Sequence, residues 1–420
     1  MTKDTVLVIE PDFSGHRWRY AEWAAQACVE AGYQCIIVTA SANAPHPLAQ
    51  RLAGCDGDGR AGGPNAAGLQ ITFVDPPTDA PRGGLGWLSY VRFFRYFQHV
   101  YRTVSREYGV VRVIVPYVDY FLYGLPLLGS PFGAMPWIGI TMRSTFHHHE
   151  VGVRAPRRPL LNALKAQLFR RALRTKGLKT LLTIDPTLGD WCVNHPEPGC
   201  APVQYLADPC PDAMVTDPQL ARERLGFSLY GQYVLVYGAI SERKGIFELV
   251  DALAAREDAP TLVIAGAQDM DVRAPLNKAL MPLTPQPVIL DRFISSETEN
   301  DLFSACDVVW LGYKGHYGMS GVLVQAYRAA KPLIATADGL IGWFCRNGEL
   351  GPVIEDLSSD SINQALDAAL ESGGVRPFAA TGHLLERNTL GHFKQTLQSV
   401  VREDPNVWAA AECSPGTAAT

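Results

Sequence analysis

Short apolar runs recur along the whole chain, and longer segments with helical spacing separate them. The runs are continuously apolar rather than alternating, which is typical of strands buried on both faces of a parallel sheet covered by helices. We therefore predict an α/β protein. The predicted strands cover 6–9, 35–38, 71–74, 111–115, 137–140 and 181–184 in the first half, and 233–236, 261–264, 288–290, 308–311, 332–335 and 353–354 in the second.

The pattern breaks once, near YLADPCPDA at 205–213, where prolines, aspartates and small residues are typical of a linker. A chain of 420 residues is also too long for one compact core. We predict two Rossmann-like domains, at 1–205 and 206–380. The last residues, 404–420, lack a repeating apolar face and are expected to form a flexible tail.

The composition is that of an ordinary soluble protein, with 47% hydrophobic and 19% charged residues. The net charge of −5 gives no overall basic field, so we expect no nucleic-acid partner. The sequence shows no signal peptide, no apolar stretch long enough to span a membrane, and nine cysteines without CxxC spacing. We expect a cytoplasmic protein, and peripheral attachment to the inner face of the membrane remains open.

Ligands of doubly wound sheets bind beyond the carboxyl ends of the strands, so the loops there are the candidate sites. The first such loop is PDFSGHRWRY at 11–20. Gly15 permits a tight turn, and the following helix offers free N–H groups to a ligand. We predict that Gly15, His16 and Arg17 bind substrate, with His16 as a catalytic candidate. The alternative is a helix start whose polar residues only face water.

The loop GAISERKGI at 238–246 follows the first predicted strand of the second half. Its cations Arg243 and Lys244 come just before a helix, so two positive charges and a helix N-terminus converge. This combination predicts a diphosphate site, although an exposed Arg-Lys pair can also be a solvated turn.

A third loop, at 312–336, is rich in glycine and leads into a helix. Ser320 can cap that helix or bind a phosphate, and Gly321 lets a phosphate approach the backbone. Gln325 lies one turn further, where its amide can reach the hydroxyls of a sugar or a ribose.

The segment TMRSTFHHHE at 141–150 contains three consecutive histidines. Adjacent side chains cannot all face one ion, and no second group of ligands accompanies them, so we expect no metal. A single histidine such as His148, or Arg143, facing the cleft as a catalytic or acceptor-binding group is the preferred interpretation. Asp119, after the fourth predicted strand, is a similar catalytic candidate.

The second half of the chain resembles the donor-binding domain of GT-B glycosyltransferases of the family 4 (group 1) kind. The matching motifs stand in family order: VLVYGAISERKGIFELVDAL, LVIAGAQD, VILDRFISSETENDLFSACDVVWLGY and AYRAAKPLIATADGLIGW. Within the third motif, the residues from Ser296 to Glu299 also read as a capping box. The resemblance covers about 233–343 and is weaker in the first half, where it depends on the Gly15-His16 loop.

This resemblance implies two Rossmann-like domains that face a cleft, with a nucleotide-sugar donor on the second domain and a sugar or lipid-linked acceptor on the first. It also implies a C-terminal helix at 381–403 that crosses back to the first domain, retention of anomeric configuration, and no metal or other cofactor. Carried over by motif, Gly238, Lys244 and Arg243 would hold the donor diphosphate, and the amides of Ser320 and Gly321 would assist.

Three positions depart from the family pattern, the first being Ala239, where the family often carries an arginine. The family carries two glutamates that contact the donor sugar and the ribose, and the corresponding residues here are Tyr317 and Gln325. Gln325 can still hydrogen-bond a ribose, though less strongly than a carboxylate. Tyr317 leaves the stereochemical outcome open.

The segment 154–179 contains nine lysines and arginines and no acid. Its leucines fall near one helical face, as in helices that bind an anionic membrane surface. Packing of this segment against the domain, with its charges in water, is the alternative.

The sequence therefore predicts a glycosyltransferase that moves a sugar from a nucleoside diphosphate to an acceptor hydroxyl in polysaccharide or glycolipid assembly. Two alternatives stay open. One is a non-catalytic glycosyltransferase-like subunit, which the missing glutamates favour. The other is a nucleotide-sugar epimerase of GT-B fold, which would need an acid and a base near the sugar.

Overall fold

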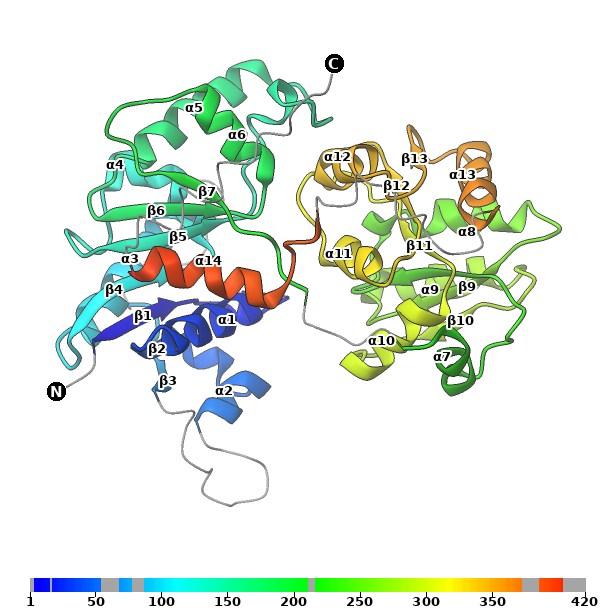
Figure 1. Ribbon diagram of the computed structural model, residues 1–420, viewed down its shortest axis with the longest axis horizontal. Helices are drawn as coiled ribbons and strands as arrows, with labels where there is room; N and C mark the ends of the chain where they lie inside the picture. The colour runs from blue at the N-terminus through cyan, green and yellow to red at the C-terminus, as the bar shows by residue number, and fades with distance from the viewer. Residues whose placement is uncertain are drawn as a thin grey trace, which may run out of the picture. The chain divides into compact units, whose positions relative to one another are not determined.

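The computed structural model describes residues 4–15, 17–53, 68–77, 87–210, 216–371 and 385–402. These residues form two compact units. The first unit takes in the described residues of 1–146, 158–206 and 390–402, and the second takes in those of 147–157 and 207–389. Each unit is an α/β layer structure built on its own parallel sheet (Figure 1).

The sheet of the first unit has seven parallel strands in the order β3-β2-β1-β4-β5-β6-β7. Its strands are β1 (Thr5–Ile9), β2 (Gln34–Thr39), β3 (Leu69–Phe73), β4 (Val110–Val115), β5 (Trp137–Thr141), β6 (Leu178–Thr183) and β7 (Val203–Tyr205). Its helices are α1 (Arg17–Glu30), α2 (Pro47–Leu52), α3 (Trp87–Val104), α4 (Leu125–Leu128), α5 (Pro159–Ala172), α6 (Pro186–Asn194) and α14 (Leu390–Arg402).

The sheet of the second unit has six parallel strands in the order β10-β9-β8-β11-β12-β13. Its strands are β8 (Tyr233–Tyr237), β9 (Thr261–Ala265), β10 (Val288–Leu290), β11 (Val308–Leu311), β12 (Leu333–Thr336) and β13 (Val353–Ile354). Its helices are α7 (Pro218–Leu225), α8 (Ile246–Ala254), α9 (Met270–Leu280), α10 (Ser296–Ala305), α11 (Gly321–Arg328), α12 (Gly339–Asn347) and α13 (Ser359–Glu371).

The apolar runs of the sequence become the buried strands of these sheets. Every residue of β1 and β5 is buried, and so is every residue of β11, because helices cover both faces. All twelve predicted strands are confirmed. The short strand β7 was not predicted, since its three residues directly precede the linker-like sequence.

Helix α14 belongs to the first unit, although it lies at the far end of the chain. It packs beside α1, as Figure 1 shows. Phe393 is fully buried and meets the rings of Tyr20 and Trp23 edge-on, at centroid distances of 5.6 and 5.9 Å. Lys394 adds an ion pair with Glu30 at 2.6 Å. Burial of these aromatic rings is the main force holding α14 on the first unit.

Candidate functional site

Each sheet has a point where the strand order reverses, and a polar loop leaves the strand there. In the first sheet this strand is β1, between β2 and β4; in the second it is β8, between β9 and β11. The loops after β1 and β8 therefore occupy the positions where open α/β sheets bind ligands.

In the second unit, the loop after β8 places the Lys244 ammonium at the carboxyl end of the sheet. The Lys244 side chain is 6% exposed. Its Nζ donates to the carbonyl oxygen of Tyr237 at 2.6 Å and to the hydroxyl of Tyr313 at 2.8 Å, and lies 4.6 Å from the Tyr313 ring centroid. Both contacts are to neutral groups, so the charge of Lys244 is held in place without being neutralised by them.

Two glycines make this arrangement possible. Gly238 ends β8 with φ +95°, and a side chain added there would meet Lys244 Nζ at 3.5 Å. Gly245 has φ +63°, and its Cβ would lie 2.2 Å from the carbonyl oxygen of Gly312. The loop after β8 thus packs backbone to backbone on the loop after β11, which only glycine permits. The indole of Trp310 fixes the same turn by donating to the carbonyl oxygen of Lys244 at 2.8 Å.

Ser320 and Gly321 stand where α11 begins, at the carboxyl end of β11. Ser320 occupies the N-cap position, but its side chain makes no capping hydrogen bond. Plain side-chain capping, one reading of the sequence, is therefore not found. A side chain added at Gly321 would meet nothing within 4 Å, so the backbone there is open. The first amides of α11 are available to an anion at this edge.

Gln325 has a carboxylate beside it that the sequence did not reveal. Its Nε2 donates to Glu299 Oε1. Glu299 lies in the first turn of α10. The N-cap of α10 is Ser295, which accepts from the Thr298 amide at 3.3 Å. The capping box predicted from Ser296 to Glu299 is therefore wrong by one residue, and Glu299 turns to Gln325 instead.

The remaining predicted donor residues lie in the same two loops. Arg243 contacts His316 between Nη1 and Nδ1 at 3.0 Å. Tyr317 lies against Gly339, where an added Cβ would come within 2.5 Å of the Tyr317 Cα. Its carbonyl oxygen accepts from the Leu340 amide at 3.2 Å. The second unit thus gathers all seven predicted donor residues on two neighbouring loops and the helix that follows.

In the first unit, three side chains form a hydrogen-bonded series at the carboxyl end of β1. Arg17 Nη1 donates to the Tyr120 hydroxyl at 2.7 Å, and Tyr120 donates to Glu10 Oε1 at 2.7 Å. Arg17 also pairs with Asp12. Glu10 is fully buried, and burial raises the pKa of its carboxyl to about 8. Glu10 is therefore largely a neutral acid at pH 7.

Asp119 is half-buried one residue before Tyr120 and ties the loop after β4 to the end of β5. Its carboxylate accepts from the Thr141 hydroxyl and from the Met142 amide, both at 2.8 Å. Burial raises the pKa of Asp119, and these hydrogen bonds oppose that rise. Both carboxylate oxygens are used inside the unit, an arrangement that holds the loop in shape.

Two arginines approach one aromatic ring in this unit. The guanidinium carbon of Arg17 lies 5.3 Å from the Tyr117 ring centroid, and that of Arg143 lies 5.5 Å from it. Gly15 has φ +64°, as the tight turn before α1 requires. His16 lies outside the described residues. The structure thus brings Arg17, Arg143 and Asp119 to one edge of the first sheet.

Solved glycosyltransferase structures share this architecture over nearly the whole chain. Sucrose-phosphate synthase from Thermosynechococcus elongatus has a TM-score of 0.68 at 14% identity, covering 97% of this chain and 100% of its own. WaaG, a glycosyltransferase involved in lipopolysaccharide biosynthesis, has 0.61 at 16% identity, covering 95% and 100%. Anabaena HepE in complex with UDP-glucose has 0.62 at 13% identity, covering 95% and 100%. At such identities the likeness establishes the fold.

The sequence match lies in the second unit. Residues 231–372 match the family model for Glycosyl transferases group 1, a stretch that includes Lys244, Ser320 and Gln325. The chain has the GT-B fold, and its second unit carries a segment that matches the group 1 glycosyltransferases. No curated protein is similar in sequence. The predicted fold and enzyme class are thereby confirmed, and the group 1 segment coincides with the unit that carries the buried lysine.

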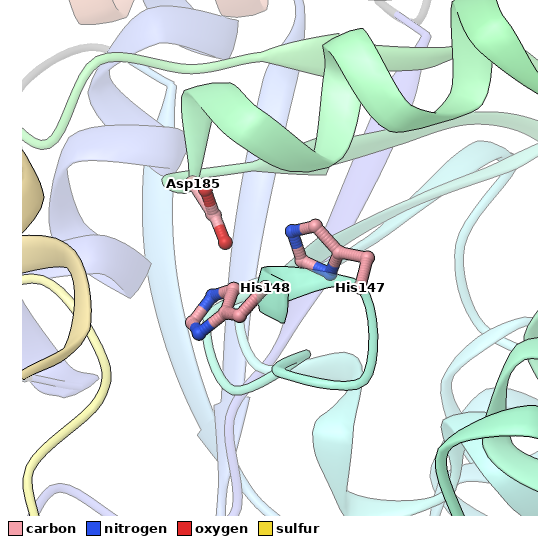
Figure 2. A group of neighbouring side chains, drawn as sticks. All are labelled: His147, His148 and Asp185. Carbon is pink, nitrogen blue, oxygen red and sulfur yellow. The ribbon is translucent and has the colours of Figure 1, made fainter. Parts of the chain in front are cut away.

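One further group of side chains in this glycosyltransferase was not foreseen. His147, His148 and Asp185 are neighbouring buried side chains, and Figure 2 shows the Asp185 carboxylate pointing toward the two rings. Their potential ligand atoms lie within 4.8 Å of one another. Asp185 is also the N-cap of α6, where its Oδ1 accepts from the Thr187 amide at 2.9 Å. Asp185 is a third potential ligand, which the sequence did not indicate; the absence of a metal stays a prediction.

The residues that sequence reasoning missed share one property. Glu10, Tyr120 and Glu299 each reach their partner from a different element of the fold. One signal was present: Glu10 is a carboxylic acid directly after a fully apolar strand. A buried acid at that position is unusual enough to have been singled out.

Proposed function

We propose that the chain transfers a sugar from a nucleoside-diphosphate sugar to an acceptor hydroxyl. The buried ammonium of Lys244 at the switch point of the second sheet carries the proposal. A fixed cation beside open helix amides is suited to the charge that develops on a leaving nucleoside diphosphate. HepE, which has the same fold, has been solved with UDP and with UDP-glucose.

The donor would lie on the second unit. Lys244 would bind the diphosphate, with Arg243 as a second cation, and Gly238 would let the phosphates approach the backbone. The amides of Ser320 and Gly321 would add hydrogen bonds. These groups supply the positive potential themselves, so we propose that transfer needs neither a metal nor another cofactor.

The nucleoside and the sugar would meet the residues further along the same edge. Gln325 would face the ribose, with the Glu299 carboxylate next to it. Tyr317 would contact the donor sugar. By the family resemblance we propose retention of the anomeric configuration, which proton NMR of the first-formed product tests: an inverted anomeric coupling would contradict it.

The acceptor would lie on the first unit, at the loop after β1. Gly15, His16 and Arg17 would bind it, with Arg143 and Asp119 of the same unit as the further candidates for contact with the reacting groups. Guanidinium groups donate several hydrogen bonds in a fixed geometry, which suits a sugar hydroxyl or an anionic substituent.

We further propose that the acceptor is presented at a membrane, as in cell-surface polysaccharide or glycolipid assembly. Helix α5 buries Ala166, Phe169 and Ala172, whereas Leu160 is 88% exposed and Leu164 is 55% exposed. These leucines face away from the core, so packing inside the unit does not explain them. Basic side chains lie along the same helix, which favours an anionic lipid surface. None of the described helices is long and apolar enough to cross a bilayer.

Calorimetric titration with UDP, GDP, ADP and their common sugar conjugates tests the donor assignment. We expect one nucleotide to bind with a dissociation constant on the order of micromolar. Nucleotide release with a panel of p-nitrophenyl glycosides and hexose phosphates as acceptors then tests transfer.

The outcomes separate the proposal from its alternatives. Binding with transfer supports it. Binding without transfer to any acceptor, alongside sugar interconversion, would point to an epimerase. Absence of binding to every nucleotide would overturn the donor site and favour a non-catalytic subunit.

A further inference from the structure

A buried carboxylic acid stands at the centre of the acceptor edge, and the proposed reaction does not use it. Glu10 follows β1 directly and has no solvent exposure. Its Oε1 accepts from the Tyr120 hydroxyl at 2.7 Å and from the Asp12 amide at 3.1 Å. Its Oε2 is buried and has no hydrogen-bond partner among the residues that the structure describes. Such an orphaned polar atom is costly in a core, so its retention calls for a reason.

The reason lies in what Glu10 does to its neighbours. A phenol has one proton to donate, and Tyr120 gives it to Glu10, which leaves the Tyr120 oxygen to accept from Arg17 Nη1 at 2.7 Å. The direction of the series, from Arg17 through Tyr120 to Glu10, is therefore set by the acid. Contact with Phe93 confines the Tyr120 ring, since the two ring centroids lie 4.3 Å apart with an interplanar angle of 33°. Tyr120 therefore connects Glu10 to Arg17 through a side chain with little freedom to move.

We propose that Glu10 is a positioning residue for the acceptor: through Tyr120 it holds the Arg17 guanidinium in the place where the acceptor binds. This inference rests on the proposed function, which puts the acceptor at Arg17. Glu10 itself contacts neither substrate. Its effect should fall on the KM for the acceptor, while the KM for the donor should not change.

The position of the Arg17 guanidinium should depend on pH, because it depends on the protonation state of Glu10. Burial raises the pKa of Glu10 to about 8; the Tyr120 and Asp12 hydrogen bonds and the Arg17 charge oppose that rise, and the Asp12 charge adds to it. Tyr96 and Tyr117 also feel the Glu10 charge. Above about pH 8 the ionised acid attracts the Arg17 cation more strongly, because opposite charges interact strongly in a poorly solvated site. The arginine is then drawn toward the interior.

The side-chain 15Nη signals of Arg17 test the positioning without any substrate. They are assigned by their loss in Arg17→Lys. We expect restrained signals in the wild type at pH 7, averaged signals in Glu10→Ala and Tyr120→Phe, and restrained signals in Glu10→Gln, whose amide oxygen still accepts from Tyr120. The wild-type signals should shift with a midpoint near pH 8, and those of Glu10→Gln should not.

Tyr96→Phe is the matched control. Tyr96 is also a buried tyrosine of the first unit, but its hydroxyl donates to the Val74 carbonyl oxygen at 3.1 Å, away from Arg17. Loss of its hydroxyl should leave the Arg17 signals as in the wild type. Restrained Arg17 signals in Glu10→Ala, or equal changes in Tyr96→Phe and Tyr120→Phe, would overturn the proposal.

Steady-state kinetics test whether the position of Arg17 affects the reaction. They use whichever glycoside or hexose phosphate of the panel above accepts the sugar. We expect Tyr120→Phe and Glu10→Ala to raise the acceptor KM about tenfold at pH 7, with little change in kcat or in donor hydrolysis by water. The wild-type acceptor KM should rise above pH 8, and that of Glu10→Gln should stay level. If nucleotides fail to bind at all, the proposed function fails, while the NMR result still decides whether Glu10 positions Arg17.

Discussion

The carboxyl edges of the two sheets hold their functional groups in opposite ways. In the second unit, Lys244 and the start of α11 come from two neighbouring glycine-rich loops, and the backbone is open at Gly321. In the first unit, the acid, tyrosine and arginine series joins groups after β1 and β4 and is mostly buried. At the edge of the second sheet, backbone amides and a cation are accessible to a ligand. At the edge of the first sheet, the polar side chains hydrogen-bond to one another.

Under the proposed function, the difference reflects what each edge would recognise. The diphosphate is common to all nucleoside-diphosphate sugars, so a short segment of glycines and one lysine would suffice. An acceptor differs from enzyme to enzyme, and its recognition requires side chains positioned from several elements. This contrast predicts that changes at the second edge act on nucleotide affinity, and that changes at the first edge act on stability, pH dependence and acceptor affinity.

The largest expected effect concerns the stability of the first unit. The folded pKa of Glu10 is raised from 4.5 to about 8, so the native state keeps a proton that the unfolded chain releases. Stability is therefore lost as pH rises from 4.5 to 8 and is level above that. The full loss is on the order of 3–5 kcal/mol.

The Glu10→Gln variant should not lose stability as the pH rises, because its amide does not ionise. Scanning fluorimetry should show its Tm gaining on that of the wild type between pH 5 and 8, by on the order of 5–10 °C. A constant difference across that range would mean that Glu10 is ionised throughout, contrary to its burial.

The next effect concerns the donor edge. Lys244→Ala should weaken nucleotide binding by about 30- to 100-fold, or ~2–3 kcal/mol, because a charge-assisted contact to phosphate is lost. Calorimetry measures it, and Lys278→Ala, an exposed lysine on α9, is the control. Equal affinity in both variants would remove Lys244 from the donor site.

A smaller effect is expected at the exposed face of α5. Replacing Leu160 and Leu164 with glutamate should reduce sedimentation with phosphatidylglycerol vesicles about tenfold, because apolar contact is lost and negative charge is added. Transfer to a water-soluble acceptor should not change, since neither leucine lies in the proposed site. Sedimentation equal to that of the wild type would place the lipid contact elsewhere or exclude it.

Breaking the contact between Gln325 and Glu299 should lower nucleotide affinity about fivefold. Glu299→Ala frees the Gln325 amide, and nucleotide affinity should fall by ~1 kcal/mol. Glu297→Ala, an exposed acid in the same turn of α10, is the matched control. If both variants bind nucleotide as the wild type does, Glu299 has no part in donor recognition.

No effect at all is expected from chelation. Dialysis against EDTA should leave the transfer rate unchanged, because Lys244 and the α11 amides supply the positive potential. A rate that falls on dialysis and recovers on addition of Mg²⁺ or Mn²⁺ would contradict the metal-free proposal.

The edge of the second sheet, where we propose that the donor binds, was largely predictable from the chain. The loop after β8 and the segment from Ser320 to Gln325 are contiguous, and their glycines mark sharp backbone requirements that survive in a linear sequence. The edge of the first sheet, where we propose that the acceptor binds, was predictable only in part, through Arg17 and Arg143. That Tyr120 would join Glu10 to Arg17 depends on β4 lying beside β1, a pairing of strands separated by two others in the chain.

The sequence by itself determined the class of fold, twelve of the thirteen strands found in the described residues, and the location of the lysine loop. These follow from local signals: apolar runs fit buried parallel strands, and glycine permits backbone that other residues strain. Only the tertiary structure showed which partners the carboxyl groups of Glu10 and Glu299 have. Glu10 and Glu299 acquire their roles from burial and from partners on other elements, and a buried polar group takes its meaning from the groups that desolvate and contact it.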